Sequence, residues 1–207
     1  MRPSTIVAIG IAVILAIAAA VIYTKIPQHE TAVVNSEEVP LPPWAISFGQ
    51  PDATTLLIEL YDLHCPYCAK AHEQLDPLYG QLIREGKLRV VFLDLVVHPE
   101  AVPAHRLLHC AYRELGDATF GLISRLYEVF LREGPYKQLE LLSQYNCDDA
   151  PTEAEFNNAV RALLTYLSKR GVAVRGIGTP TFIVIKGGAI NVVVGAEVEK
   201  VRSLLSQ

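Results

Sequence analysis

The pattern of hydrophobic residues divides the chain into segments that predict different elements. Residues 6–23 form one apolar run without a charged side chain. Residues 54–61 and 88–97 are shorter apolar runs, which is typical of strands buried on both faces of a sheet. Elsewhere, apolar residues recur at helical spacing. The pattern therefore predicts an α/β domain preceded by an apolar leader.

The two shorter runs flank a helical stretch over residues 66–85. A strand, a helix and a strand at this spacing predict a βαβ unit with parallel strands and a right-handed crossover. A wholly helical section follows over about residues 98–171, and its last helix opens at the capping-box pair Thr152 and Glu155.

The pattern then returns to strands. Residues 181–186 and 190–194 flank a Gly-Gly turn, which indicates a hairpin, and residues 197–205 predict a last helix. The predicted order is βαβ, a block of helices, and ββα.

The leader has the length of a membrane span. As a helix rising about 1.5 Å per residue, residues 6–23 would cover roughly 27 Å, close to the thickness of the hydrocarbon core of a bilayer. The positive charge of Arg2 favours an N-terminus on the inner side. A cleaved signal peptide is the alternative, because the alanines at 18–20 resemble a cleavage site. We predict a retained transmembrane anchor over residues 1–24, a single-pass protein of the cell membrane, and an extracytoplasmic location for the rest of the chain.

Residues 25–47 contain several prolines and a polar stretch without a core-facing period, which predicts a linker. The folded domain is expected over residues 48–207, with the helical section as an insertion. Trp44 is expected to pack on that domain.

Charge and cysteine content narrow the function. The formal net charge is −4, and phosphate binding needs clustered Lys and Arg, so we expect no nucleic-acid partner. The chain has four cysteines, and disulfides persist in oxidising compartments outside the cytoplasm. An exported C-x-x-C pair is therefore compatible with redox chemistry.

The motif Cys65-Pro66-Tyr67-Cys68 supplies the two thiols that disulfide exchange requires. Proline is favoured at the first helical position, so Pro66 places Cys65 at or near a helix N-cap, where free N–H groups stabilise a thiolate. Cys68 lies one turn further into the helix and should be more buried. We therefore expect Cys65 to attack and Cys68 to resolve. If His64 is charged, it lowers the pKa of the attacking thiol further.

Metal binding and an inert structural disulfide are the competing interpretations of this motif. A zinc site would combine the motif cysteines with His64 and His72, but closed sites usually draw ligands from two segments, and no second C-x-x-C is present nearby. We assign no metal site and expect no cofactor.

Two further pairs lie in the helical section. His105 and His109 are spaced for a metal, but a solvated helix face is the favoured interpretation. Cys110 and Cys147 either form a second, structural disulfide, which export favours, or remain buried thiols.

Several stretches resemble DsbA-like thioredoxin-fold proteins. These are Phe-Gly-Gln-Pro-Asp-Ala at 48–53, Glu-Leu-Tyr-Asp at 59–62 with the C-P-Y-C motif, and Gly-Ile-Gly-Thr-Pro-Thr-Phe at 176–182, which is similar to the cis-proline loop of the family. The helical section resembles the inserted helical domain of these proteins. The resemblance implies a thioredoxin fold with a helical insertion.

The resemblance also implies roles for individual residues. Cys65 matches the nucleophile, Cys68 the resolving thiol, Pro180 the cis-proline, Thr179 the residue whose backbone contacts substrate, and Glu59 the buried acid that tunes the cysteines. The remaining neighbours expected to contact substrate are His64, Pro66 and Tyr67.

Without the resemblance, three of these positions have plainer interpretations. Pro180 would be assigned to a trans turn, Glu59 to an ion pair at a sheet edge, and Asp62 to a turn or a helix cap.

The implied activity is a thiol–disulfide oxidoreductase that introduces disulfides into reduced exported proteins and is reoxidised by a membrane redox partner. A reductase or an isomerase using the same centre is the alternative, because the Pro-Tyr dipeptide does not fix the direction of electron flow. The short linker leaves little room for the N-terminal dimerisation domain of dimeric isomerases. An exported metal-binding module is the alternative from a different class.

Overall fold

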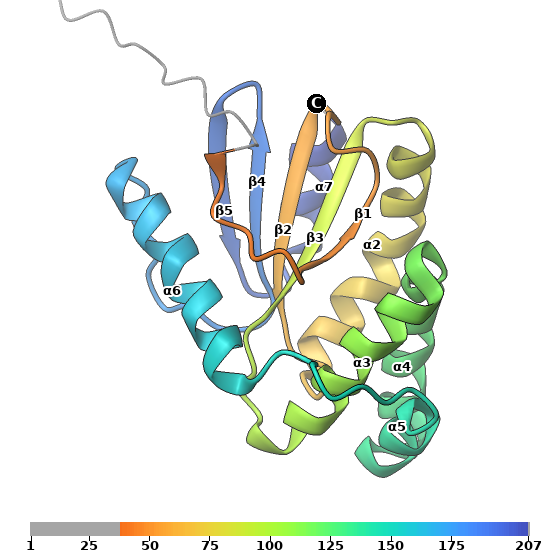
Figure 1. Ribbon diagram of the computed structural model, residues 1–207. Coiled ribbons are helices and arrows are strands. Elements are labelled where there is room, and N and C mark those ends of the chain that lie inside the picture. Colours follow the sequence, from red (N-terminus) through yellow and green to blue (C-terminus); the bar gives the residue numbers. More distant parts are fainter. Residues whose placement is uncertain (1–37, 207) are drawn as a thin grey trace, which may run out of the picture. The chain divides into compact units, whose positions relative to one another are not determined.

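A five-stranded sheet organises residues 38–206, the part of the chain that the computed structural model describes (Figure 1). The strand order is β1-β3-β2-β4-β5, which places β2 at the centre. The strands are β1 (Ile46–Phe48), β2 (Thr55–Tyr61), β3 (Leu88–Asp94), β4 (Thr181–Lys186) and β5 (Ala189–Val194). The helices are α2 (Pro66–Arg84), α3 (Val102–Leu115), α4 (Thr119–Glu133), α5 (Pro135–Leu142), α6 (Glu153–Lys169) and α7 (Val198–Ser206). Two short 3-10 helices are η2 (Pro99–Ala101) and η3 (Gly116–Ala118).

The predicted βαβ unit is present. Strands β2 and β3 are parallel and are joined through α2, whereas β4 pairs antiparallel with β2, and β5 pairs antiparallel with β4. Strand β1 was not predicted. It is antiparallel to β3 and only three residues long, too short for an alternating pattern to be recognised.

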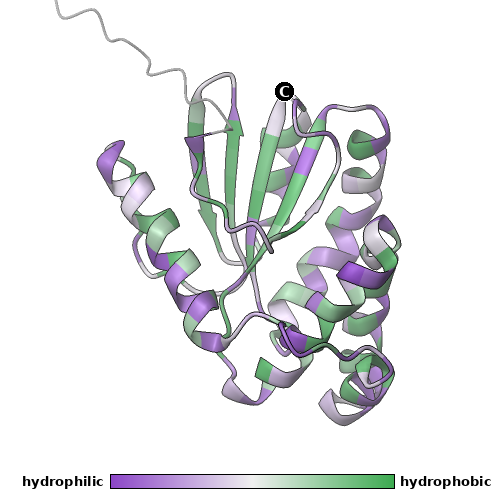
Figure 2. Cartoon of the chain, in the orientation of Figure 1, coloured by the Kyte–Doolittle hydropathy of each residue, from purple (hydrophilic) through white to green (hydrophobic). Residues whose placement is uncertain are grey.

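Strand β2 is buried on both faces, as its apolar run predicts. Its residues Leu57 and Tyr61 pack in a core with α2, α3, α4 and α7, whereas Leu56 and Ile58 pack in a second core with α6. Figure 2 shows the strands as mostly hydrophobic and the helices as mixed, because each helix turns only one side toward a core.

The helical insertion runs from η2 to α6. A disulfide joins Cys110 of α3 to Cys147, which follows α5, with an S–S distance of 2.04 Å. The capping box of Thr152 and Glu155 opens α6 as predicted.

The segment that precedes β1 packs on the domain. Val39 is buried, and the ring of Trp44 makes edge contacts with His109 and Phe156, so this part of the predicted linker belongs to the folded unit. The predicted anchor over residues 1–24 lies outside the described residues. Among residues 38–206, no helix combines the length and the apolar character that a membrane crossing requires.

Candidate active site

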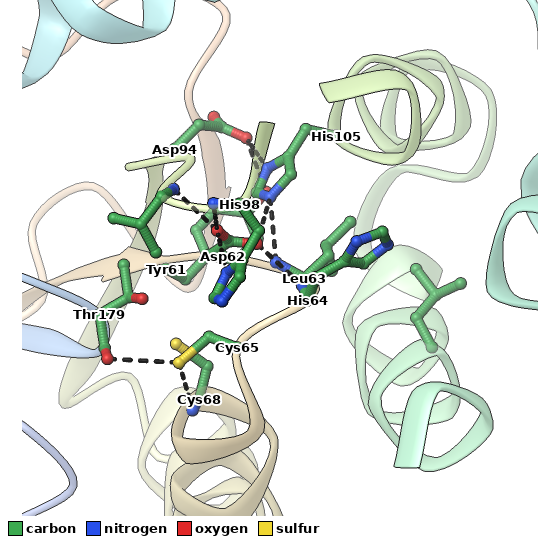
Figure 3. A network of polar contacts seen from close by, with 12 residues as sticks. Tyr61, Asp62, Leu63, His64, Cys65, Cys68, Asp94, His98, His105 and Thr179 are labelled. Atoms are coloured by element: carbon green, nitrogen blue, oxygen red, sulfur yellow. Dashed lines mark hydrogen bonds and ion pairs between the residues drawn. The ribbon is translucent and has the colours of Figure 1, made fainter. Parts of the chain in front are cut away.

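Cys65 is the N-cap residue of α2. Its backbone is extended, Pro66 occupies the first helical turn, and the N–H of Cys68 donates to Cys65 Sγ over 3.4 Å. Both sulfurs are buried and both thiols are free (Figure 3). The sequence prediction of an N-cap cysteine is confirmed, and the helix terminus directs N–H groups at its sulfur.

The two thiols differ in acidity. Hydrogen bonds from Cys68, opposed by burial, lower the pKa of Cys65 to about 6. Burial, together with the hydrogen bond to Cys65, raises the pKa of Cys68 far above its usual range. Because the thiolate is the nucleophile, Cys65 is the thiol prepared to attack or to leave.

A cis peptide bond joins Thr179 to Pro180 beside this sulfur. The thiol of Cys65 donates to the Thr179 carbonyl oxygen over 3.3 Å, and the Pro180 carbonyl accepts from the N–H of Gly195 over 2.8 Å. The cis bond agrees with the resemblance and not with the trans turn that the residues alone suggested. The loop thus presents its backbone to Cys65.

Glu59 is fully buried in the central strand β2, not at a sheet edge. Its Oε2 accepts from the hydroxyl of Tyr79 over a long 3.4 Å, and its Oε1 has no hydrogen-bond partner. Burial raises the pKa of Glu59 to about 8, and the charges of Asp76 and Cys65 act in the same direction. The ion pair that the residues alone suggested is therefore wrong.

The remaining neighbours of the motif differ in exposure. Pro66 and Tyr67 are exposed, and 67% of Tyr67 is accessible, so both can contact a partner. His64 is buried, and its ring stacks on Phe130 with centroids 5.4 Å apart. Burial lowers the pKa of His64, so the expected assistance from a charged His64 is not found.

The histidines considered for metal binding have other partners. His72 is buried and its Nε2 lies 3.1 Å from Ser124 Oγ. Within residues 38–206, no group of three His, Cys, Asp or Glu side chains converges in a way that would hold a metal ion.

The solvated face predicted for His105 and His109 is wrong, because both histidines are buried and bond to Asp94 at the end of β3. Two signals were available in the sequence: the polar residue that ends an apolar strand, and the four-residue spacing of the histidines. The sequence pattern could not show that Asp94 contacts these histidines, because β3 and α3 come together only in the folded chain.

Asp62 forms the turn before the redox motif, as predicted. Its Oδ1 accepts from the N–H of His64 over 2.8 Å, and its carbonyl accepts from the N–H of Cys65 over 3.1 Å. Its Oδ2 accepts from the N–H groups of Val97 and His98, each over 2.8 Å. Sequence reasoning missed this second set of partners, because they lie on another segment.

A thioredoxin family model matches residues 43–195, which include the redox motif and the cis-proline loop. A search of curated proteins found no match.

Similar solved structures come from several bacteria. α-DsbA1 of Wolbachia pipientis has a TM-score of 0.57 at 21% identity, with 83% of this chain and 94% of that chain covered. A periplasmic thioredoxin-like protein of Salmonella enterica serovar Typhimurium has a TM-score of 0.55 at 18% identity, covering 84% and 96%. Oxidised BdbD of Bacillus subtilis has a TM-score of 0.52 at 17% identity, covering 79% and 91%. These likenesses show the fold, a thioredoxin fold with a helical insertion.

Proposed function

The chain belongs to the thioredoxin family, and on that premise we propose that it is a thiol–disulfide oxidoreductase that introduces disulfides into exported proteins. The observation that carries the proposal is the asymmetry of the redox pair: Cys65 is the N-cap of α2 and its sulfur accepts from the N–H of Cys68 over 3.4 Å, whereas Cys68 is fully buried one turn further into the helix. The pKa of Cys65 is lowered to about 6 and that of Cys68 is raised accordingly. A stabilised Cys65 thiolate stabilises the reduced form of the pair. This favours electron uptake by the oxidised pair.

The reaction begins with the Cys65–Cys68 disulfide. A substrate thiolate attacks the sulfur of Cys65, a mixed disulfide forms, and Cys68 leaves and takes up a proton. A second substrate thiolate attacks the substrate sulfur of the mixed disulfide, and Cys65 leaves as its stabilised thiolate. The substrate loses two electrons and gains a disulfide, and the redox pair is left reduced.

Three neighbouring residues have roles in this scheme. The backbone of Thr179 and Pro180 faces Cys65 and receives the substrate main chain beside the mixed disulfide. Glu59, whose pKa of about 8 lets it hold or release a proton near neutral pH, supplies the proton that Cys68 takes up as it leaves. Its effect on the acidity of Cys68 supports this role.

Exposed Pro66 and Tyr67 border the sulfur and extend the substrate contact. His64 is left out of this surface because it is buried.

An extracytoplasmic location completes the proposal. The apolar run over residues 6–23 serves as a membrane anchor within residues 1–24, the polar segment that follows spaces the domain from the bilayer, and a membrane redox partner regenerates the disulfide. The Cys110–Cys147 disulfide supports this location, because disulfides of this kind persist in oxidising compartments.

The equilibrium of the redox pair with glutathione tests the direction of electron flow. A reduction potential near about −120 mV, the oxidising end of the range for this fold, would support the oxidase. A potential near about −270 mV would instead support the reductase alternative and overturn the oxidase.

Trapping tests the assignment of the two thiols. Cys68→Ala should accumulate mixed disulfides through Cys65, whereas Cys65→Ala should form none. The metal-binding alternative predicts stoichiometric metal in the purified protein and loss of that metal in His72→Ala.

A further inference from the structure

His105 lies in the interior of the domain between two buried carboxylates, beside the turn that precedes the redox motif (Figure 3). Its Nδ1 is 2.6 Å from Asp94 Oδ1, and its Nε2 is 3.6 Å from Asp62 Oδ1. The nearer contact of Nε2 is the backbone N–H of Leu63, which donates to it over 3.0 Å. One imidazole ring therefore connects the end of β3 to the turn before Cys65.

The hydrogen bonds define the protonation of this ring. Because Leu63 donates to Nε2, that nitrogen carries no proton, and the Nδ1–H donates to Asp94. Burial opposes a charge on the ring, whereas the hydrogen bonds and charges of Asp62 and Asp94 raise the pKa of His105. A protonated Nε2 would face the Leu63 N–H and find its acceptor, Asp62 Oδ1, 3.6 Å away, so the geometry corresponds to the neutral ring.

The contact matters because the turn leads directly to the nucleophile. Successive backbone N–H groups are held there: Leu63 by His105, His64 by Asp62 Oδ1, and Cys65 by the Asp62 carbonyl. On the other side of the same residue, the Leu63 carbonyl accepts from Gln138 Nε2 over 3.1 Å. The insertion therefore fixes both polar backbone groups of Leu63: α3 binds its N–H through His105, and α5 binds its carbonyl through Gln138.

We propose that His105 is a positioning residue of the redox centre, which fixes Leu63 and thereby the placement of Cys65 at the N-terminus of α2. This inference rests on the proposed redox role of Cys65. The alignment of Cys65 Sγ with the Cys68 N–H, which stabilises the thiolate, depends on where the backbone enters the helix. Loss of the His105–Leu63 hydrogen bond frees the backbone at this point and weakens the stabilisation of the Cys65 thiolate. His105 therefore links the helical insertion to the chemistry at the motif.

The experiment measures the pKa of Cys65 in the reduced full-length chain, from the pH dependence of its alkylation by iodoacetamide. His105→Leu removes the acceptor for Leu63 and should raise the pKa of Cys65 by about half a unit or more, equivalent to about a threefold change in the thiol ionisation constant. His105→Gln supplies an amide oxygen that can accept from Leu63 and should restore most of the wild-type profile.

His109→Gln is the matched control. His109 is buried on the same helix and bonds to Asp94 Oδ2 over 2.9 Å, but no hydrogen bond joins it to residues 62–65. The His109→Gln substitution should lower the free energy of unfolding without changing the pH dependence of Cys65 alkylation. If His105→Leu loses stability and keeps the wild-type profile, His105 is merely structural and the proposal is overturned.

A measurement on the wild-type chain remains decisive if His105→Leu does not fold. The nitrogen-15 spectrum of the imidazole should show a protonated Nδ1 and an unprotonated Nε2, with the Leu63 amide protected from hydrogen exchange. A proton on Nε2 would overturn the proposal. Alkylation requires no protein substrate, so its outcome is independent of the potential that tests the oxidase.

Discussion

Glu59 and Asp62 are both fully buried carboxyl groups close to the redox motif, yet their acidities move in opposite directions. Glu59 receives one long hydrogen bond, from Tyr79, and burial raises its pKa to about 8. Burial opposes the charge of Asp62 as well, but the backbone N–H groups of His64 and His98 donate to its carboxylate oxygens and hold its pKa well below the usual range.

The difference teaches that burial alone does not set the charge of a carboxyl group. The number of donors directed at the charged form decides it. Asp62 is consequently a permanent anion that organises the backbone, whereas Glu59 can exchange a proton near neutral pH. One site therefore holds a carboxylate for architecture and a carboxylic acid suited to proton transfer.

The largest effect is expected from removing the charge of the well-bonded carboxyl group. Asp62→Asn replaces an acceptor oxygen by an NH₂ group that faces backbone donors. We expect a loss of about 3–5 kcal/mol in the free energy of unfolding at pH 7. Denaturation in urea measures it.

Asp52→Asn, in an exposed turn, is the control and should unfold like the wild type. A loss of less than about 1 kcal/mol in Asp62→Asn would contradict the view that its charge organises this turn.

Glu59→Gln should have a smaller effect, visible in the pH dependence of stability. The folded pKa of Glu59 is raised above the unfolded value of 4.5 to about 8, so between these values the folded state holds a proton that the unfolded state has lost. Its contribution is therefore complete below the unfolded pKa and declines as pH rises toward 8. Between pH 5 and pH 7, Glu59→Gln should remove a decline of about 2–3 kcal/mol in the free energy of unfolding.

Denaturant titrations of both proteins at several pH values measure this difference. Equal slopes for the variant and the wild type would show that Glu59 is ionised in the folded protein at neutral pH, contrary to its proposed role in proton transfer.

The smallest effect is expected from Tyr79→Phe. The Tyr79 hydroxyl favours the charged form of Glu59 through a bond of 3.4 Å, so its removal should raise the pKa of Glu59 further, with a cost below about 1 kcal/mol. Denaturant titrations at several pH values measure the pH at which the free energy of unfolding stops declining, and this pH should be higher in Tyr79→Phe than in the wild type.

Tyr112→Phe removes a different phenol hydroxyl, one that donates to the Ser47 carbonyl, and should leave that pH unchanged. A downward shift in Tyr79→Phe would mean that the hydroxyl does not stabilise the Glu59 carboxylate.

The two carboxyl groups also show how far sequence reasoning reached. The apolar run around Glu59 predicted a strand buried on both faces, and the position of Asp62 after that strand predicted a turn; both predictions are confirmed. Neither pattern contained the partners that set the acidities. Tyr79 lies on the helix that follows, and Val97 and His98 lie beyond the next strand.

Local patterns in the sequence were sufficient for the elements and for the redox motif. Hydrophobic period, a proline after the first cysteine and a capping box act over a few residues, so strands β2 to β5, helix α2 and the N-cap position of Cys65 were predictable from short segments, whereas the three-residue strand β1 was not. The resemblance added the cis bond before Pro180, which no local pattern required.

Only the tertiary structure decided which polar groups meet. The burial of His105 and His109, the donors around Asp62 and the isolation of Glu59 each depend on segments brought together by the sheet and the helical insertion. The physical reason is that pKa shifts and hydrogen bonds depend on distances between atoms and on the exclusion of water, and only the folded chain establishes these for residues far apart in sequence.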